Sequence, residues 1–257
     1  MDFGLAGKAA LITGATSGLG LASAQALAAE GAAVSIVGRR GEVARDEAAA
    51  LPNAIGLEAD ITDPGAPQRI VDATLDAFGR IDILVGSTGG PTPGTALDTG
   101  ADAYDAALDL LVKPMVRLAH LVVPHMQAKG WGRIVFVTST VVREPVSMLV
   151  LSNSVRMAVH GFAKSLSKQV AAEGITVNCV LPGRIATDRV ASLDRAAAEA
   201  SGRSIVEIRA GAEKGIPARR YGRPAEFGAV VAFLCSEQAA YVTGTSVTVD
   251  GGATAGH

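Results

Sequence analysis

The sequence has few aromatic residues, little cysteine and no block of basic charge. Aromatic residues make up 4% of the 257 residues, two cysteines are present, and the formal net charge is −2. Without a basic patch or stripe, we expect no nucleic acid as a partner. Cys179 and Cys235 each lie in an apolar run, which predicts buried, reduced thiols and no disulfide. The four histidines have no metal-ligand spacing, so we expect no metal site.

Long apolar runs are also missing. No uninterrupted stretch reaches the roughly 18 apolar residues that a membrane-spanning helix needs, so no membrane partner is expected. The first residues, Met1 to Leu5, lack a basic region followed by an apolar run, and no signal peptide is predicted. With its two reduced thiols, the protein is expected to be cytoplasmic.

Short apolar runs alternate with longer segments of helical period along the whole chain. This pattern predicts one α/β domain over residues 1–257, a doubly wound, Rossmann-type parallel sheet of seven strands with helices on both faces. A segment rich in Ala, Arg and Glu, at about 184–220, interrupts the alternation and is interpreted as a mobile lid. The expected strands are 9–12, 33–37, 55–59, 81–85, 133–137, 176–180 and 246–249, and the expected helices are 18–30, 42–50, 64–78, 101–128 (kinked at Pro114) and 150–172.

A glycine-rich segment, Thr-Gly-Ala-Thr-Ser-Gly-Leu-Gly at 13–20, follows the first expected strand and opens the first expected helix. Glycines there allow a tight turn and a close approach to phosphate, and the helix start presents free N–H groups to the anion. The segment therefore predicts binding of a dinucleotide pyrophosphate, although a tight turn without a ligand is the alternative. The residues expected at the phosphates are Gly14, Thr16, Ser17, Gly18, Leu19 and Gly20.

The spacing T-G-x-x-x-G-x-G resembles the short-chain dehydrogenase/reductase family, and within it the 3-oxoacyl-[acyl-carrier-protein] reductase branch. The resemblance runs from about residue 5 to residue 252 and includes Arg-Pro-Ala-Glu at 223–226 and Val-Asp-Gly-Gly at 249–252. It implies that Asp60 contacts the adenine and that Pro182 and Gly183 lie beside the nicotinamide. The further cofactor contacts that it implies are Ile61, Thr88, Gly89, Ile185 and Thr187.

The end of the second expected strand bears on the choice of cofactor. An acidic residue there would favour the ribose hydroxyl of NAD(H), but the chain has Gly38 followed by Arg39 and Arg40. A guanidinium favours a 2′-phosphate by charge and geometry, so NADP(H) is predicted over NAD(H). The alternative is that both arginines are merely solvated at a helix start.

The catalytic positions that the resemblance implies are only partly matched. The family uses a serine, a tyrosine, a lysine four residues after the tyrosine, and an asparagine; this chain has Ser139, Ser152, Arg156 and Leu111 there. Serine is a far weaker acid than tyrosine, and an arginine stays protonated at neutral pH. Arg156 can still hold ribose hydroxyls and supply positive charge, because positions 152 and 156 share a helix face. A solvated helix-face arginine is the alternative.

Other protonatable residues are also candidates for the proton donor. Glu144 is expected in a loop bordering the pocket and could act as a general acid if burial raised its pKa, although a surface pair with Arg143 is favoured. Lys113 is a weaker candidate, with a solvent-facing lysine as the alternative. Tyr104 and Tyr221 lie outside the expected catalytic helix.

These observations predict an NADP(H)-dependent oxidoreductase that interconverts a carbonyl and an alcohol on a small or acyl-thioester substrate. Ser139 would bond to the carbonyl oxygen, and the proton would come through Ser152, a relayed water or Glu144. Two alternatives stay open: an NADP(H)-binding protein without dehydrogenase activity, serving as a sensor or in assembly, and a non-redox lyase or isomerase.

The two longest expected helices bear on assembly. They carry more apolar residues than one sheet face would easily hide, which, together with the resemblance, predicts a homotetramer. These residues are Leu110, Leu111, Val116, Leu118, Val122, Val123, Met157, Val159, Phe162 and Leu166.

Overall fold

Seven short runs of aliphatic and β-branched residues form one parallel sheet in the computed structural model, which describes residues 2–255. The sheet order is β3-β2-β1-β4-β5-β6-β7, and every neighbouring pair is parallel, which confirms the predicted doubly wound sheet. The strand order reverses between β1 and β4, where ligands bind in folds of this type. The strands are β1 (Ala9–Ile12), β2 (Ala33–Gly38), β3 (Ala54–Glu58), β4 (Ile83–Gly86), β5 (Gly132–Val137), β6 (Ile175–Pro182) and β7 (Ser246–Val249).

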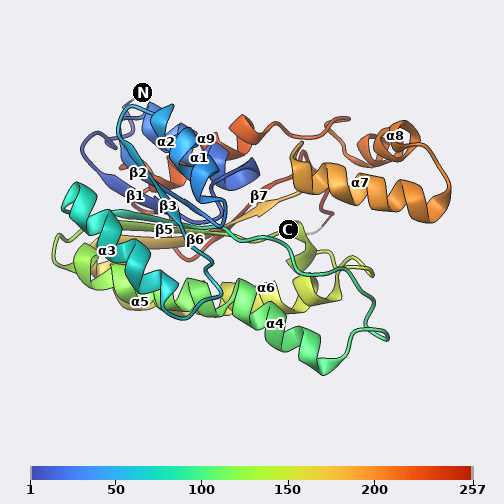
Figure 1. Cartoon of the computed structure of the whole chain (residues 1–257), viewed down its shortest axis with the longest axis horizontal. Helices are drawn as coiled ribbons and strands as arrows, with labels where there is room; N and C mark the ends of the chain where they lie inside the picture. Colours follow the sequence, from blue (N-terminus) through green and yellow to red (C-terminus); the bar gives the residue numbers. More distant parts are fainter. Residues whose placement is uncertain (1, 256–257) are drawn as a thin grey trace.

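Helices cover both faces of the sheet (Figure 1). One face carries α1 (Gly18–Ala29), α2 (Gly41–Ala49) and α9 (Pro224–Cys235), with α1 packed against α9. The other face carries α3 (Ala66–Phe78), α4 (Ala101–Leu111), α5 (Lys113–Gln127) and α6 (Val150–Val170). Between β6 and α9, α7 (Asp188–Ser201) and α8 (Ile205–Gly215) extend beyond the sheet. None of the described helices is long and apolar enough to cross a membrane.

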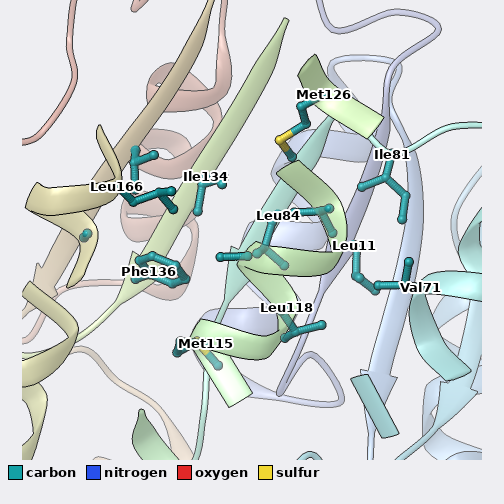
Figure 2. Close-up of a cluster of buried hydrophobic side chains, with 14 of the residues drawn as sticks. Leu11, Val71, Ile81, Leu84, Met115, Leu118, Met126, Ile134, Phe136 and Leu166 are labelled. Atoms are coloured by element: carbon teal, nitrogen blue, oxygen red, sulfur yellow. The ribbon is translucent and has the colours of Figure 1, made fainter. Parts of the chain in front are cut away.

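Two apolar clusters, one on each face, hold these layers together. Figure 2 shows the cluster under α5, where Met115 and Leu118 of the helix lie near Leu84 and Phe136 of the sheet. All four side chains are buried, and burying a side chain of this kind stabilises the fold by about 1.5–3 kcal/mol. The opposite cluster joins β1, β2 and β5 to α1 and α9. The sheet is therefore anchored on both sides of the strand ends that form the site.

The segment 101–128 differs from the expected single kinked helix. It forms two helices, α4 and α5, which meet at Val112. Pro114 lies in the first turn of α5, where a missing N–H has no intrahelical partner to lose. The proline thus starts a second helix instead of bending one helix.

The apolar residues of the long helices are hidden within the protomer to a larger extent than expected. Half of the ten residues named above are buried inside the chain: Leu111, Leu118, Val122, Val159 and Leu166. Of the ten, Met157 has the most exposed side chain, at 50%. The sheet and its flanking helices therefore bury much of the apolar surface that the sequence analysis assigned to an interface.

Both cysteines are free and buried, as the sequence predicted. Cys179 lies on β6 and Cys235 ends α9. Burial raises the pKa of each thiol to about 12, since the charged thiolate is disfavoured away from water. Both thiols therefore stay protonated at neutral pH.

Candidate active site at the carboxyl ends of the strands

The glycine-rich turn leaves β1 and is fixed by its neighbours on both sides. The Ala15 N–H donates to Val37 O on β2 (2.9 Å). On the other side, the Thr13 hydroxyl donates to Ser87 O (2.7 Å) and accepts from Ser87 N–H (3.0 Å) just after β4. Gly14 has φ +59°, a conformation that disfavours any side chain. The turn is therefore held as a rigid cradle at the point where the strand order reverses.

The helix that follows the turn begins with main-chain N–H groups that no side chain caps. Ser17 is the N-cap of α1, has an extended backbone and makes no side-chain capping bond. The close packing of α1 on the turn depends on Gly20, because a Cβ there would lie 2.3 Å from Gly14 O. Free N–H groups, a positive helix end and a close backbone approach are what a phosphate requires. The residues present thus fit a dinucleotide pyrophosphate.

The two arginines after β2 are both exposed beside this turn. Arg40 donates to Thr16 O (3.0 Å) and to Thr16 Oγ1 (3.3 Å), so it ties the end of β2 to the turn. Asp60 follows β3 and accepts from the main chain and side chain of Thr62, which hold its pKa below the ordinary value; the charge of Arg39 adds to this effect. Arg39 therefore lies on the Asp60 side of the turn.

Arg156 connects three elements at the centre of the site. Its Nε donates to Ser152 Oγ one turn earlier on α6 (3.1 Å). One terminal nitrogen donates to Val137 O at the end of β5 (3.2 Å), and the other donates to Gly89 O after β4 (3.3 Å). Its side chain is 8% exposed, so the alternative of a solvated helix-face arginine does not describe it.

The charge on Arg156 is held in an unfavourable environment. Burial lowers the pKa of its guanidinium to about 10, and the positive charge of Arg189 on α7 adds to this effect. At neutral pH the group nevertheless remains protonated. Its three bonding partners within the protein are a hydroxyl and two main-chain carbonyls, all neutral.

Two serine hydroxyls belong to the segments that this guanidinium contacts. Ser152 is buried and accepts from Arg156, which leaves its own proton free to donate. Ser139 follows β5, two residues after the carbonyl that Arg156 contacts, and its oxygen accepts weakly from Val141 N–H (3.4 Å). Both hydroxyls therefore retain a proton for a ligand oxygen.

The turn after β6 borders the site next to the segment that follows β5. Gly183 N–H donates to Val249 O (3.0 Å), and a Cβ on Gly183 would lie 2.5 Å from the Asp250 Cβ, so the chain passes closely there. Thr140 donates to Pro182 O (3.4 Å), which links this turn to the segment after Ser139. Pro182 and Gly183 thus lie beside the residues that follow β5.

The start of α7 returns toward the glycine-rich turn. Thr187 caps α7 by accepting from Val190 N–H, and its methyl carbon is 3.5 Å from where a Gly18 Cβ would be. Ile185 is buried under the same segment. Thr88 donates to Gly89 O (3.1 Å), the same carbonyl that accepts from Arg156, whereas Ile61 packs partly buried against the core.

A sequence profile of the family described as enoyl-(acyl carrier protein) reductase matches residues 14–254. Dehydrogenase/reductase SDR family member 4 of Oryctolagus cuniculus is 37% identical over 97% of this chain and 94% of its own length. The 3-oxoacyl-[acyl-carrier-protein] reductase FabG of Salmonella typhimurium is 33% identical, covering 96% of this chain and 97% of its own. L-sorbose reductase from Gluconobacter frateurii, crystallised with NADPH and L-sorbose, is 30% identical with a TM-score of 0.95 over 100% of both chains.

This chain belongs to the short-chain dehydrogenase/reductase family. The resemblance described above implies an asparagine at the position of Leu111, and the structure places this leucine in an apolar cluster with Leu151 and Val155 between α4 and α6. Residue 111 therefore has no polar side chain that could hold a relayed water in this short-chain dehydrogenase/reductase.

The structure also locates the other protonatable candidates. Glu144 is exposed and accepts from Ala255 N–H (3.2 Å), so it lacks the burial that a role as general acid would require. It also does not form the expected ion pair with Arg143. Lys113 is exposed and pairs with Asp109 (2.5 Å), as its solvent-facing alternative predicted.

Within residues 2–255, no tyrosine hydroxyl is hydrogen-bonded to Ser152, whose partner is Arg156. Tyr104 packs in the apolar cluster of α4 and α6, and Tyr241 is fully exposed. Tyr221 is buried at the base of the segment 184–220, where its hydroxyl donates to Asp194 (2.9 Å). Burial and this hydrogen bond raise the pKa of Tyr221, which further removes it from acid catalysis.

Sequence reasoning missed one residue of the site. Arg189, in the first turn of α7, donates to Pro91 O (3.3 Å), and its guanidinium lies 2.8 Å from where a Gly90 Cβ would be. The sequence offered no signal for it, because it is one of many arginines in the segment 184–220. Only the fold brings this segment against the loop after β4.

Proposed function

We propose that the protein is an NADP(H)-dependent oxidoreductase that interconverts a carbonyl and an alcohol on a small or acyl-thioester substrate. The observation that carries the proposal is the position of Arg156, whose guanidinium joins Ser152 to the ends of β4 and β5. A cation and two hydroxyl donors thus lie at the strand ends where this fold binds its ligands.

The cofactor is NADP(H), which supplies or accepts the hydride when bound. The glycine-rich turn fits its pyrophosphate, and Arg39 and Arg40 provide positive charge beside the turn for a 2′-phosphate. The absence of an acidic residue at position 38 supports the same choice, since a carboxylate there would repel that phosphate. The L-sorbose reductase that shares this fold was crystallised with NADPH.

The chain's own residues polarise the carbonyl and stabilise its oxygen. Ser139 and Ser152 each have a hydroxyl proton to donate, and Arg156 places a buried positive charge beside Ser152. A buried charge of this kind stabilises negative charge that develops on oxygen far better than the same charge in water. Serine is a weak acid, so it is not an independent acid at neutral pH: Ser152 gives its proton to the alkoxide oxygen as the hydride arrives, and solvent restores that proton through a water molecule.

The experiment follows binding and turnover separately. NADPH binding is measured by its fluorescence, and its oxidation by absorbance with a panel of ketones, sugar-derived ketones and 3-oxoacyl thioesters. We expect saturable binding and turnover with at least one class. Tight binding without turnover across the panel would refute the oxidoreductase proposal.

A second experiment restores the pair that the family resemblance implies, with Ser152→Tyr and Arg156→Lys together. If the natural residues already support reduction, the double variant should change the rate and the pH profile of an existing activity. Ser154→Ala, at an exposed serine on the same helix, is the matched control. Activity that appears only in the double variant would show that the parent is not a conventional reductase.

A second candidate is an NADP(H)-binding protein that does not turn over, such as a sensor. The burial of Leu111 among apolar side chains and the locations of the three tyrosines favour it, because the site lacks the usual proton donor. The two candidates differ in one measurement: NADPH absorbance falls with a carbonyl substrate in the first and stays constant in the second.

We also propose that the protein is a cytoplasmic homotetramer. Met157 on α6 is 50% exposed and Phe233 on α9 is 41% exposed, and Tyr241, just before β7, is fully exposed. Large apolar side chains on separate surfaces suit self-complementary contacts between copies. A light-scattering mass equal to one chain would contradict this assembly.

A further inference from the structure

Two arginines contact the same short loop after β4 from different elements. Arg156 of α6 donates to Gly89 O (3.3 Å), and Arg189 of α7 donates to Pro91 O (3.3 Å). The two charges are close enough for Arg189 to oppose the protonation of Arg156. The loop 89–91 therefore carries two guanidinium groups, one of which also contacts Ser152.

Neither positive charge is balanced within residues 2–255. No salt bridge to a carboxylate involves Arg156 or Arg189 in this part of the chain. A buried charge without a partner of opposite sign is costly, and two like charges placed close together add to that cost. Such an arrangement is stabilised by an anion that both groups can reach.

The bonding capacity of Arg156 fits a planar anion. A guanidinium has five N–H groups, and the three hydrogen bonds to Ser152, Val137 and Gly89 use one N–H on each nitrogen. One N–H is left on each terminal nitrogen, and each can donate a charge-assisted hydrogen bond to an anion such as a carboxylate. Arg189 is exposed and brings its own donors to the same loop.

We propose that the substrate is an oxo acid, or the corresponding hydroxy acid, whose carboxylate binds between Arg156 and Arg189 while its carbonyl lies at Ser152. This inference rests on the proposed function, because it names the substrate class of the same site. Arg189 is then a specificity-determining residue. Since it belongs to the segment that we interpret as a mobile lid and already contacts Pro91, carboxylate binding holds that segment against the loop 89–91.

The test compares each acid with its neutral ester. Binding of 2-, 4- and 5-oxohexanoate and of their methyl esters to the protein saturated with NADP⁺ is measured by titration calorimetry, which avoids turnover. We expect at least one acid to bind tenfold or more tightly than its ester, a difference of about 1.4 kcal/mol. In Arg189→Met this preference should fall below about threefold, and Arg189→Lys should restore part of it.

The matched control is Arg195→Met. Arg195 is also an exposed arginine of α7, but it lines an open hollow with Glu199 and Arg203, away from the loop 89–91. This variant removes the same charge from the same helix and should keep the acid preference. Melting temperatures of the three variants exclude misfolding as the cause of any loss.

Two results would overturn the inference: acids and esters that bind equally, or no binding of any acid to the NADP⁺ complex. A preference that Arg189→Met leaves unchanged would also overturn the role of Arg189. These failures are distinct from failure of the proposed function. Turnover of neutral ketones without acid preference refutes only the oxo acid, whereas acid preference without NADPH oxidation refutes only the oxidoreductase.

Discussion

Gly20 is the residue whose substitution most directly tests how the cofactor cradle is built. It lies in α1 directly over the glycine-rich turn, where an added methyl group would meet backbone atoms and no flexible side chain. The new Cβ would lie 2.3 Å from Gly14 O, 2.8 Å from Gly14 C and 2.9 Å from Ala15 Cα. Gly20→Ala therefore forces either the turn or the start of the helix to move.

The expected magnitude is a balance of two opposing effects. Alanine is favoured over glycine by about 0.8–1.0 kcal/mol in a helix interior, and by less in the first turn, where Gly20 lies. Overpacking a tight contact costs about 1–3 kcal/mol, and a contact with backbone at such distances belongs at the upper end. We expect a net loss of about 1–2 kcal/mol in the free energy of unfolding. For a chain of this size, that loss lowers the melting temperature by about 2–8 °C.

The loss should be larger for the cofactor than for the fold, because the displaced atoms are those that approach the pyrophosphate. Thermal unfolding measures the first effect, and NADPH fluorescence titration measures the second. We expect NADPH affinity to fall at least tenfold, or about 1.4 kcal/mol.

Gly211→Ala is the matched control for this substitution. Gly211 lies in the middle of α8, and the nearest atom to its Cβ position is a guanidinium nitrogen of Arg203 at 4.0 Å. With no clash, only the helix preference remains, so the melting temperature should rise or stay the same. A Gly20→Ala variant that behaves like Gly211→Ala in both assays would refute the close-approach argument.

Three further predictions concern the cofactor, the thiols and pH. Arg39→Gln should lower NADPH affinity about tenfold and leave NADH affinity unchanged, because one charge-assisted contact to the 2′-phosphate is lost. In the same titration, the control variant Arg45→Gln on α2 should change neither affinity. Ellman's reagent at pH 8 should react with neither cysteine of the native protein and with both in urea, because burial protects the thiols and raises their pKa to about 12. The affinity of the NADP⁺ complex for an oxo acid should be constant between pH 7 and 9 and fall above about pH 10, because the lowered pKa of Arg156 means that its positive charge is lost there. Calorimetry across this pH range measures the affinity. A fall that begins below pH 8 would contradict the assignment of Arg156 as a carboxylate ligand.

The sheet and the cradle were predictable because their signals are local. Each strand is a short apolar run, and the glycine-rich segment lies where a strand passes into a helix, so the order of the elements gave the parallel sheet. The break at Val112 was missed because a proline pattern does not distinguish a kinked helix from a helix that ends and a second that begins.

The candidate site was only partly predictable because its chemistry depends on contacts between distant segments. The family register placed Ser152 and Arg156 on one helix face, and their hydrogen bond agrees with that placement. Whether Arg156 was buried or solvated, however, depended on how α6 packs against β4 and β5. Arg189 could not be found at all, since its contact with Pro91 joins residues far apart in the sequence.

The two ends of the segment 184–221 lie side by side. Main-chain bonds join its ends, from Gly222 N–H to Arg184 O (3.0 Å) and from Ala186 N–H to Gly222 O (2.8 Å). Arg184 and Tyr221 also converge on Asp194, at 2.5 Å and 2.9 Å. The entropy of closing such a loop grows only with the logarithm of its length, so doubling the length between these joined ends costs about 0.6 kcal/mol. The two helices of this segment thus stand on a closed base, so changes in their length or sequence leave the strand ends of the sheet in place.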